Sequence, residues 1–210
     1  MRKATRIVAS LLGVFAGIGG PEHGIFEILR GSVRPEGLIF PSIGPPCDPE
    51  QIWHACEPAM SVLPNFQVTG ILATIVGIIT MIWAVAFVQR RRGGLILILL
   101  SVVLLLVGGG LFPPLIGVVA GVVGTRINTP PAGRPNRISW SLAHLWPWSL
   151  VAFFAWLLGQ FPIGHFFNAW LMESGFLIPL LIIGLMVLSI VAAWTYDLQT
   201  QPDRGHGGNR

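Results

Sequence analysis

Apolar runs of membrane-crossing length dominate this chain, and they constrain its fold more than any other feature. A helix needs about 20 mostly apolar residues to cross the ~30 Å hydrocarbon core of a bilayer. Residues 66–88 and 176–194 have about that length and contain no charged residue. Only 10% of the 210 residues are charged, whereas a soluble domain has about 25%. The sequence therefore predicts an all-α integral membrane protein.

The predicted architecture has about five transmembrane helices and one short re-entrant helix that begins at a proline. We expect the transmembrane helices at residues 7–29, 66–88, 95–112, 145–161 and 176–194, and the short helix at residues 113–124. All of them belong to a single transmembrane domain, residues 1–196, and a polar cytoplasmic tail follows at residues 197–210.

Residues 95–124 form one apolar stretch that is too long for a single untilted crossing. Gly108, Gly109 and Gly110, followed by Pro113 and Pro114, interrupt it. Glycine weakens a helix and proline removes a backbone donor, so we expect the chain to turn back into the membrane here. A single long span is the alternative, and it would reverse the orientation of everything that follows.

The first apolar segment begins after a basic N-terminus and contains Pro21. Its basic start and short apolar run are also typical of a secretory signal peptide. However, residues 17–20 are a poor cleavage site, and apolar character resumes at Ile25. We interpret the segment as a retained helix that the proline interrupts.

Basic clusters at the ends of the predicted spans determine the predicted orientation. They contain Arg2, Lys3, Arg6, Arg90, Arg91, Arg92, Arg126, Arg134 and Arg137. Cytoplasmic helix ends are enriched in such residues, so we expect both termini in the cytoplasm and the protein in the inner (cytoplasmic) membrane of a prokaryotic cell. A nucleic-acid interface would extend the clusters over a folded polar surface, so the expected partner is the lipid bilayer and not a nucleic acid.

The loop at residues 31–65 then lies outside the cell and contains both cysteines, Cys47 and Cys56. An oxidising compartment permits a disulfide, and closing so short a loop stabilises a fold by about 3 kcal/mol in the chain-entropy model. We predict a bridge between the two cysteines. Two free thiols in a reducing setting are the alternative.

Small residues recur at helical spacing on three predicted helices. The stripes are Gly13, Gly17, Gly20 and Gly24; Gly70, Ala73, Gly77 and Ala84; and Gly117, Gly121 and Gly124. Small residues let helix backbones approach closely within a bilayer. The stripes therefore predict close helix packing, with a homodimer through one stripe or a larger membrane complex as the alternative use.

Glu22, His23 and Glu27 form the most unusual polar cluster, because ionisable groups at membrane depth are costly and often mark function. His23 and Glu27 are four residues apart and share one helix face. Glu27 also continues the glycine stripe, so we expect it to point into the protein with His23 beside it. Glu22 follows Pro21 and is interpreted as an acid at a helix start.

Three roles remain open for His23 and Glu27. They could form a proton, ion or substrate site, or a structural ion pair that includes Arg30. They could instead form half of a metal site, which His165 and Glu173 on the same predicted side of the membrane would complete, with His54 in the outer loop as a further candidate.

The sequence contains none of the common catalytic motifs, such as HExxH, GxSxG or GxxxxGK[ST]. This absence argues against a recognised enzyme class and leaves the question of enzymatic activity and any cofactor open. Broken helices near membrane depth are typical of transporters, so we favour a small transporter or channel. The alternatives are a structural or accessory subunit of a membrane complex, and a metal-binding protein or intramembrane enzyme.

Two motifs, EHGxxE at residues 22–27 and GGGxxPP at residues 108–114, resemble those of a family of small, uncharacterised multi-pass membrane proteins of bacteria and archaea. The resemblance extends over residues 6–127. The chain departs from the family pattern at Arg30, where the family has glutamine. The resemblance implies an integral membrane location and no particular activity.

Overall fold

The computed structural model describes residues 1–43, 57–130 and 136–200. The helices of this part are α1 (Lys3–Leu29), α2 (Phe66–Ala86), α3 (Gly93–Leu106), α4 (Phe112–Thr125), α5 (Arg137–Ala143), α6 (Trp148–Phe166), α7 (Asn168–Glu173) and α8 (Leu177–Gln199). Two short antiparallel strands, β1 (Ile39–Pro41) and β2 (Pro58–Met60), pair with Phe40 opposite Ala59. The predicted all-helical character is therefore confirmed.

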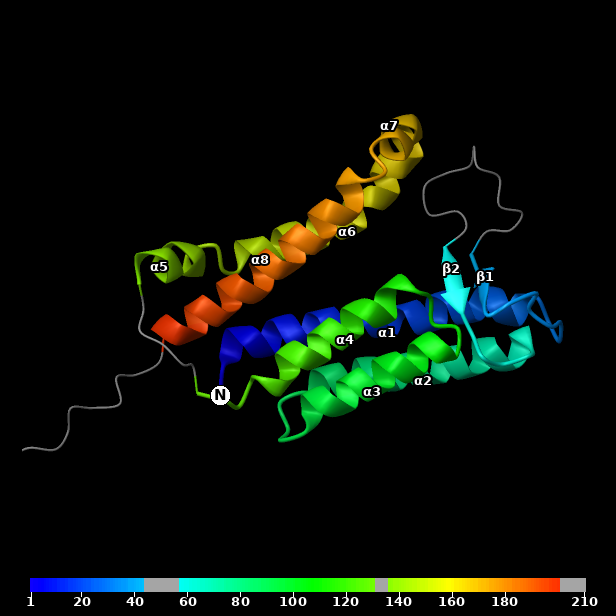
Figure 1. The fold of residues 1–210 in the computed structure, drawn as a ribbon, viewed down its shortest axis with the longest axis horizontal. Coiled ribbons are helices and arrows are strands. Elements are labelled where there is room, and N and C mark those ends of the chain that lie inside the picture. The colour runs from blue at the N-terminus through cyan, green and yellow to red at the C-terminus, as the bar shows by residue number, and fades with distance from the viewer. Residues whose placement is uncertain (44–56, 131–135, 201–210) are drawn as a thin grey trace, which may run out of the picture.

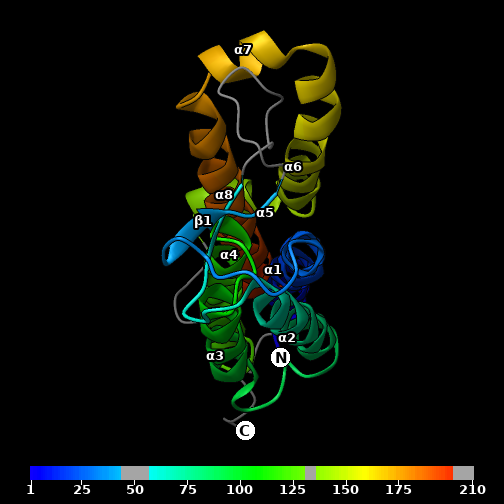
Figure 2. The same ribbon diagram turned by 90° about the vertical axis from the view of Figure 1, so that its right-hand side faces the viewer.

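The long helices are stacked in three tiers (Figures 1 and 2). α2 and α3 form one outer tier, α1 and α4 the middle tier, and α6 and α8 the other outer tier. The α6–α8 hairpin lies close to the middle tier at one end and diverges from it toward α7 (Figure 1). The best-packed part of the protein is therefore the group α1–α4.

Four helices, α1, α2, α6 and α8, are long and apolar enough to cross a membrane, so the predicted count of five is wrong. The predicted third span stops at Leu106 and has 14 residues, which corresponds to about 21 Å at 1.5 Å per residue. It stops because Gly108 and Gly110 have φ angles of 96° and 81°, a conformation that cannot continue a right-handed helix.

α4 runs back alongside α3, so residues 93–125 form a hairpin of two short helices and not one long span. Gly94, at the start of α3, packs against Gly121 and Thr125, at the end of α4. α4 carries Pro113 and Pro114 in its first turn. Backbone N–H groups of the first turn have no acceptor within the helix, so proline loses no helical hydrogen bond there. The two prolines therefore begin a helix in the returning direction.

α1 continues without interruption through Pro21, so the predicted break is wrong, and so is the interpretation of Glu22 as an acid at a helix start. An internal proline removes one helical hydrogen bond. At this level α1 is held on two sides: Gly20 packs against α2, and Gly19 packs against Pro113 of α4. Packing on both sides explains why the helix persists.

The glycine stripes pack helix against helix within one chain. A Cβ atom added at Gly20 would lie 2.4 Å from the Ala73 carbonyl oxygen, and one added at Gly24 would lie 2.5 Å from the Gly70 carbonyl oxygen. Real Cβ contacts are not this short, so only glycine permits this approach of α1 to α2. The predicted close packing is confirmed, and the homodimer stays a prediction.

The N-terminus, the loop after α4 and the end of α8 meet at one end of the protein. The Arg2 N–H donates to the Ile127 carbonyl at 3.0 Å. The Asp197 carboxylate of α8 accepts from the backbone N–H groups of Ala4 and Thr5 at 3.0 and 2.8 Å, and thus caps the start of α1. This end is the left-hand end in Figure 1, marked N.

Candidate functional site

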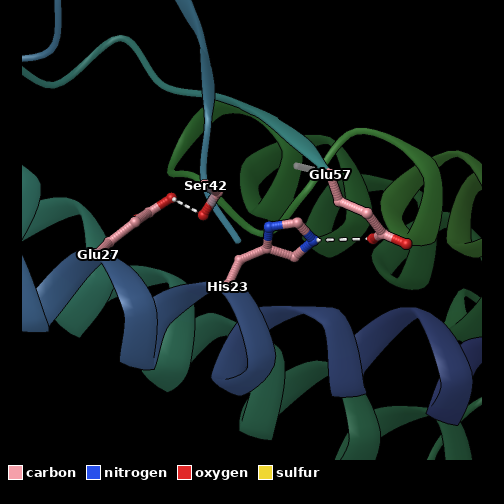
Figure 3. A network of polar contacts seen from close by, with 4 residues as sticks. All are labelled: His23, Glu27, Ser42 and Glu57. Atoms are coloured by element: carbon pink, nitrogen blue, oxygen red, sulfur yellow. Dashed lines mark hydrogen bonds and ion pairs between the residues drawn. The ribbon is translucent and has the colours of Figure 1, made fainter. Parts of the chain in front are cut away.

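His23 and Glu27 lie one turn apart on α1, near the end opposite to the N-terminus, and both are fully buried with 0% exposure. The expected orientation of both side chains toward the interior is therefore confirmed. Figure 3 shows them pointing toward the segment that carries Ser42 and the segment that carries Glu57. These two residues flank the β1–β2 pair, which lies across this end of α1.

Within the described part of the chain, one side chain donates a hydrogen bond to Glu27. The Ser42 hydroxyl donates to Glu27 Oε1 at 3.2 Å, and Ser42 is itself fully buried. Glu27 Oε2 has no hydrogen-bond partner among the described residues. A buried carboxylate oxygen without a partner is unusual, since burying such a group costs free energy that a hydrogen bond normally offsets.

His23 faces the second carboxylate of the site. Its Nε2 atom lies 3.6 Å from Oε2 of Glu57, whose side chain is 27% exposed. This is an ion-pair distance, longer than a hydrogen bond, and neither ring nitrogen of His23 has a hydrogen-bond partner in the described part of the chain. Both ring nitrogens are thus left, within the described chain, with unused hydrogen-bonding capacity.

The glycine turn between α3 and α4 packs directly on both α1 side chains. A Cβ atom at Gly110 would lie 2.4 Å from His23 Nε2, and one at Gly108 would lie 2.6 Å from Glu27 Oε2. Both glycines have positive φ angles. The two sequence motifs, distant in the chain, therefore meet at one site. The glycine backbone of the GGGxxPP motif packs against the ionisable side chains of the EHGxxE motif.

Arg30 holds the first strand segment in place and is not the direct partner of Glu27. Its guanidinium donates to the Pro41 carbonyl oxygen, and to that of Ser42 at 3.1 Å. Partial burial lowers the pKa of Arg30 below its usual value. The nearby Glu27 carboxylate opposes this effect but is the smaller of the two influences. The predicted Glu27–Arg30 pair is thus replaced by an arginine that positions the serine bonded to Glu27.

The predicted metal set is not assembled. His165 lies in the last turn of α6 and Glu173 ends α7, far along the hairpin that diverges from α1 (Figure 1). Among the described residues, no group of three or more histidine, cysteine, aspartate or glutamate side chains could hold a metal ion. Cys47, Cys56 and His54 lie outside the described residues.

Ser42, Glu57, Gly108 and Gly110 complete the site, and sequence reasoning did not assign them to it. The signal for the two glycines is the GGGxxPP motif, which predicts a helix break but does not indicate which side chains the break contacts. Glu22, the third residue of the predicted polar cluster, is half-buried within α1. No family model, curated protein or solved structure matches this chain.

Proposed function

We propose that the protein is an integral membrane protein with both termini in the cytoplasm of a prokaryotic cell. The four long apolar helices support insertion, as do the apolar side chains exposed along α2, for example Ile71, Ile75 and Ile82 at 44%, 48% and 55%. The orientation follows from the basic clusters, which gather at the N-terminal end, since cytoplasmic ends are basic. α3 and α4 then form a re-entrant hairpin.

We further propose that the protein is a small transporter or channel whose site at His23 and Glu27 binds a proton or a small cation. The observation that carries this proposal is the burial of both side chains together with polar atoms that have no hydrogen-bond partner in the described chain. Two carboxylates, a hydroxyl oxygen and an imidazole surround the site, so its chemistry favours a cation. An ionised carboxylate is costly in such surroundings, and binding a cation or a proton removes that cost.

The glycine turn supports the same proposal. Transporters place broken helices near membrane depth, where irregular backbone lines a binding site. Here residues 108–110 form the non-helical turn between α3 and α4, and they contact both ionisable groups of α1. We propose that the family with the EHGxxE and GGGxxPP motifs shares this pairing, and that the motifs recur together because they form one site.

The test replaces Glu27 by glutamine, which keeps shape and hydrogen bonding and removes the charge. We expect Glu27→Gln to express and to keep its melting temperature, but to lose proton or cation flux in proteoliposomes that contain a pH-sensitive or cation-sensitive dye. Glu36→Gln is the matched control, because Glu36 is an exposed acid on the same side of the protein.

A structural role for Glu27 makes the opposite forecast. Removing one member of a buried charged cluster costs about 3–5 kcal/mol of stability. A Glu27→Gln protein with unchanged flux and a markedly lower melting temperature would therefore contradict the proposed site.

A second candidate function is that of an accessory subunit, and the tip of the α6–α8 hairpin favours it. Phe166, Phe167 and Phe176 are 74%, 65% and 78% exposed there. A patch of this kind is typical of a surface that contacts another protein or the bilayer interface. Purification in mild detergent distinguishes the two functions, because an accessory subunit carries a stoichiometric partner and a small transporter does not.

A further inference from the structure

The N-terminal end of the protein carries a dense group of exposed cations, which we call the basic end. It consists of Lys3, Arg6, Arg90, Arg91, Arg92, Arg126 and Arg137, all of them exposed except Arg6, which is half-buried. The start of α1, the loop between α2 and α3, the end of α4 and the start of α5 contribute to this group. Their charges act on the same partner only if the structure holds these segments together.

Hydrogen bonds join these segments. The Asn128 side-chain amide donates to the Gln89 carbonyl at 2.7 Å, and so ties the loop after α4 to the loop between α2 and α3. The Arg2 N–H donates to Ile127, as described above, and Gln199 of α8 donates to the Ser139 carbonyl of α5 at 2.9 Å. These bonds hold the segments that carry the cations at one end of the protein.

Asp197 is the acidic residue of this end among the described residues, and it does not neutralise the exposed cations. It is 4% exposed, and its carboxylate is occupied by the start of α1, including the Thr5 hydroxyl at 2.7 Å. The described glutamates, Glu22, Glu27, Glu36, Glu57 and Glu173, lie toward the other end of the long helices. The basic end is thus left with a strong positive field.

Arg2 is a buried cation of this end, with 2% exposure. Its guanidinium lies 3.6 Å from the centre of the Trp194 ring, and its Nε donates to the Thr129 carbonyl at 3.0 Å. Its Nη1 is buried without a hydrogen-bond partner among the described residues. Arg2 therefore joins the segments of the basic end from within the protein.

Exposed aromatic and aliphatic side chains border the basic end. Ile138, Trp140 and Trp148 are 70%, 60% and 70% exposed, and they lie on or next to α5, which the Gln199 bond holds against α8. Tryptophan beside arginine at the ends of apolar helices is typical of the interface of a bilayer. A partner that presents both anionic groups and apolar chains therefore fits this end better than a nucleic acid or an acidic soluble protein.

We propose that the basic end binds the headgroups of anionic phospholipids, whose phosphates pair with the arginines of the loops at residues 87–92 and 126–129. Juxtamembrane clusters of this size attract anionic lipids, and arginine pairs well with phosphate. The proposal rests on membrane insertion and is independent of the site at His23 and Glu27.

The test uses the full chain purified in detergent and native mass spectrometry with added phosphatidylglycerol or phosphatidylcholine of the same acyl chains. We expect preferential binding of phosphatidylglycerol and a decrease in its affinity of about 5-fold for Arg91→Gln, and on the order of 100-fold when Arg90, Arg91 and Arg92 are all replaced by glutamine. Arg34→Gln is the matched control, because Arg34 is exposed on the opposite side of the protein, and it should leave binding unchanged.

Several results would overturn the proposal: equal binding of the two lipids, equal losses for Arg91→Gln and Arg34→Gln, or displacement of phosphatidylglycerol by single-stranded RNA or inorganic phosphate at equal concentration. Resistance of the protein to alkaline extraction from cell membranes is measured in parallel. It separates a failure of lipid selectivity from a failure of membrane insertion.

Discussion

Gly110 and Gly31 have similar backbone conformations but very different surroundings. Their φ angles are 81° and 73°. A Cβ atom at Gly110 would meet His23 Nε2, whereas one at Gly31 would meet nothing within 4 Å. The pair therefore separates the cost of a left-handed backbone from the cost of filling the space beside the imidazole.

Replacing either glycine by alanine should destabilise the protein, and Gly110→Ala should do so more. The backbone term alone costs about 1–2 kcal/mol, which is what we expect for Gly31→Ala. Overpacking at His23 adds about 1–3 kcal/mol for Gly110→Ala. Thermal unfolding in detergent measures both. Equal losses for the two variants would show that the glycine turn does not press on His23.

At the scale of the elements, the contact between α1 and α2 depends on backbone approaching backbone. Gly20 faces the Ala73 carbonyl oxygen and the Cα of Gly77. A Cβ atom added at Gly20 would lie 2.4 Å from the first atom and 2.7 Å from the second. The site depends on this contact, because α1 carries both His23 and Glu27. Gly184 of α8 is the opposite case, with nothing within 4 Å of an added Cβ.

Gly20→Ala should therefore separate α1 from α2 and lower stability by about 1–3 kcal/mol. Gly184→Ala should instead raise stability by about 0.5–1 kcal/mol, because alanine loses less backbone entropy than glycine within a helix. Melting temperatures of the two variants, measured in the same detergent, check the opposite signs. A stable Gly20→Ala variant would contradict the packing of the two helices.

At the scale of the whole molecule, charge is distributed unevenly between the two ends of the helices. The basic end gathers lysine and arginine from three parts of the chain, and the opposite end carries the described glutamates. This arrangement requires α4 to return alongside α3, because otherwise Arg126 would lie beside the site. The proposed orientation in a membrane is thus linked to the α3–α4 hairpin.

Single cysteines in a background without Cys47 and Cys56 test this orientation. In intact cells, an impermeant maleimide should label Ser32→Cys, at the site end, and should label neither Thr129→Cys nor Thr200→Cys until the cells are opened. All three positions are exposed in the structure. Labelling of Thr129→Cys but not of Thr200→Cys in intact cells would contradict the return of α4.

Several features of the fold were accessible to sequence reasoning because they depend on residues close together in the chain. The apolar runs predicted α2 to within two residues and the start of α8 to within one, since length and hydropathy are local properties. The end of α8, at Gln199, lies five residues beyond the predicted end. The glycine stripes predicted which helix faces pack closely. The spacing of His23 and Glu27 predicted their common face for the same reason.

Tertiary contacts decided the rest. α1 continues past Pro21 because α2 and α4 hold it on both sides, and α3 ends at Leu106 because the following turn packs on α1 with glycines at positive φ. The pairing of β1 with β2 places Ser42 and Glu57, which flank the two strands, beside Glu27 and His23. Periodicity reports only which residues share a face, whereas the partner of that face depends on segments far apart in the chain, which only the folded structure brings together.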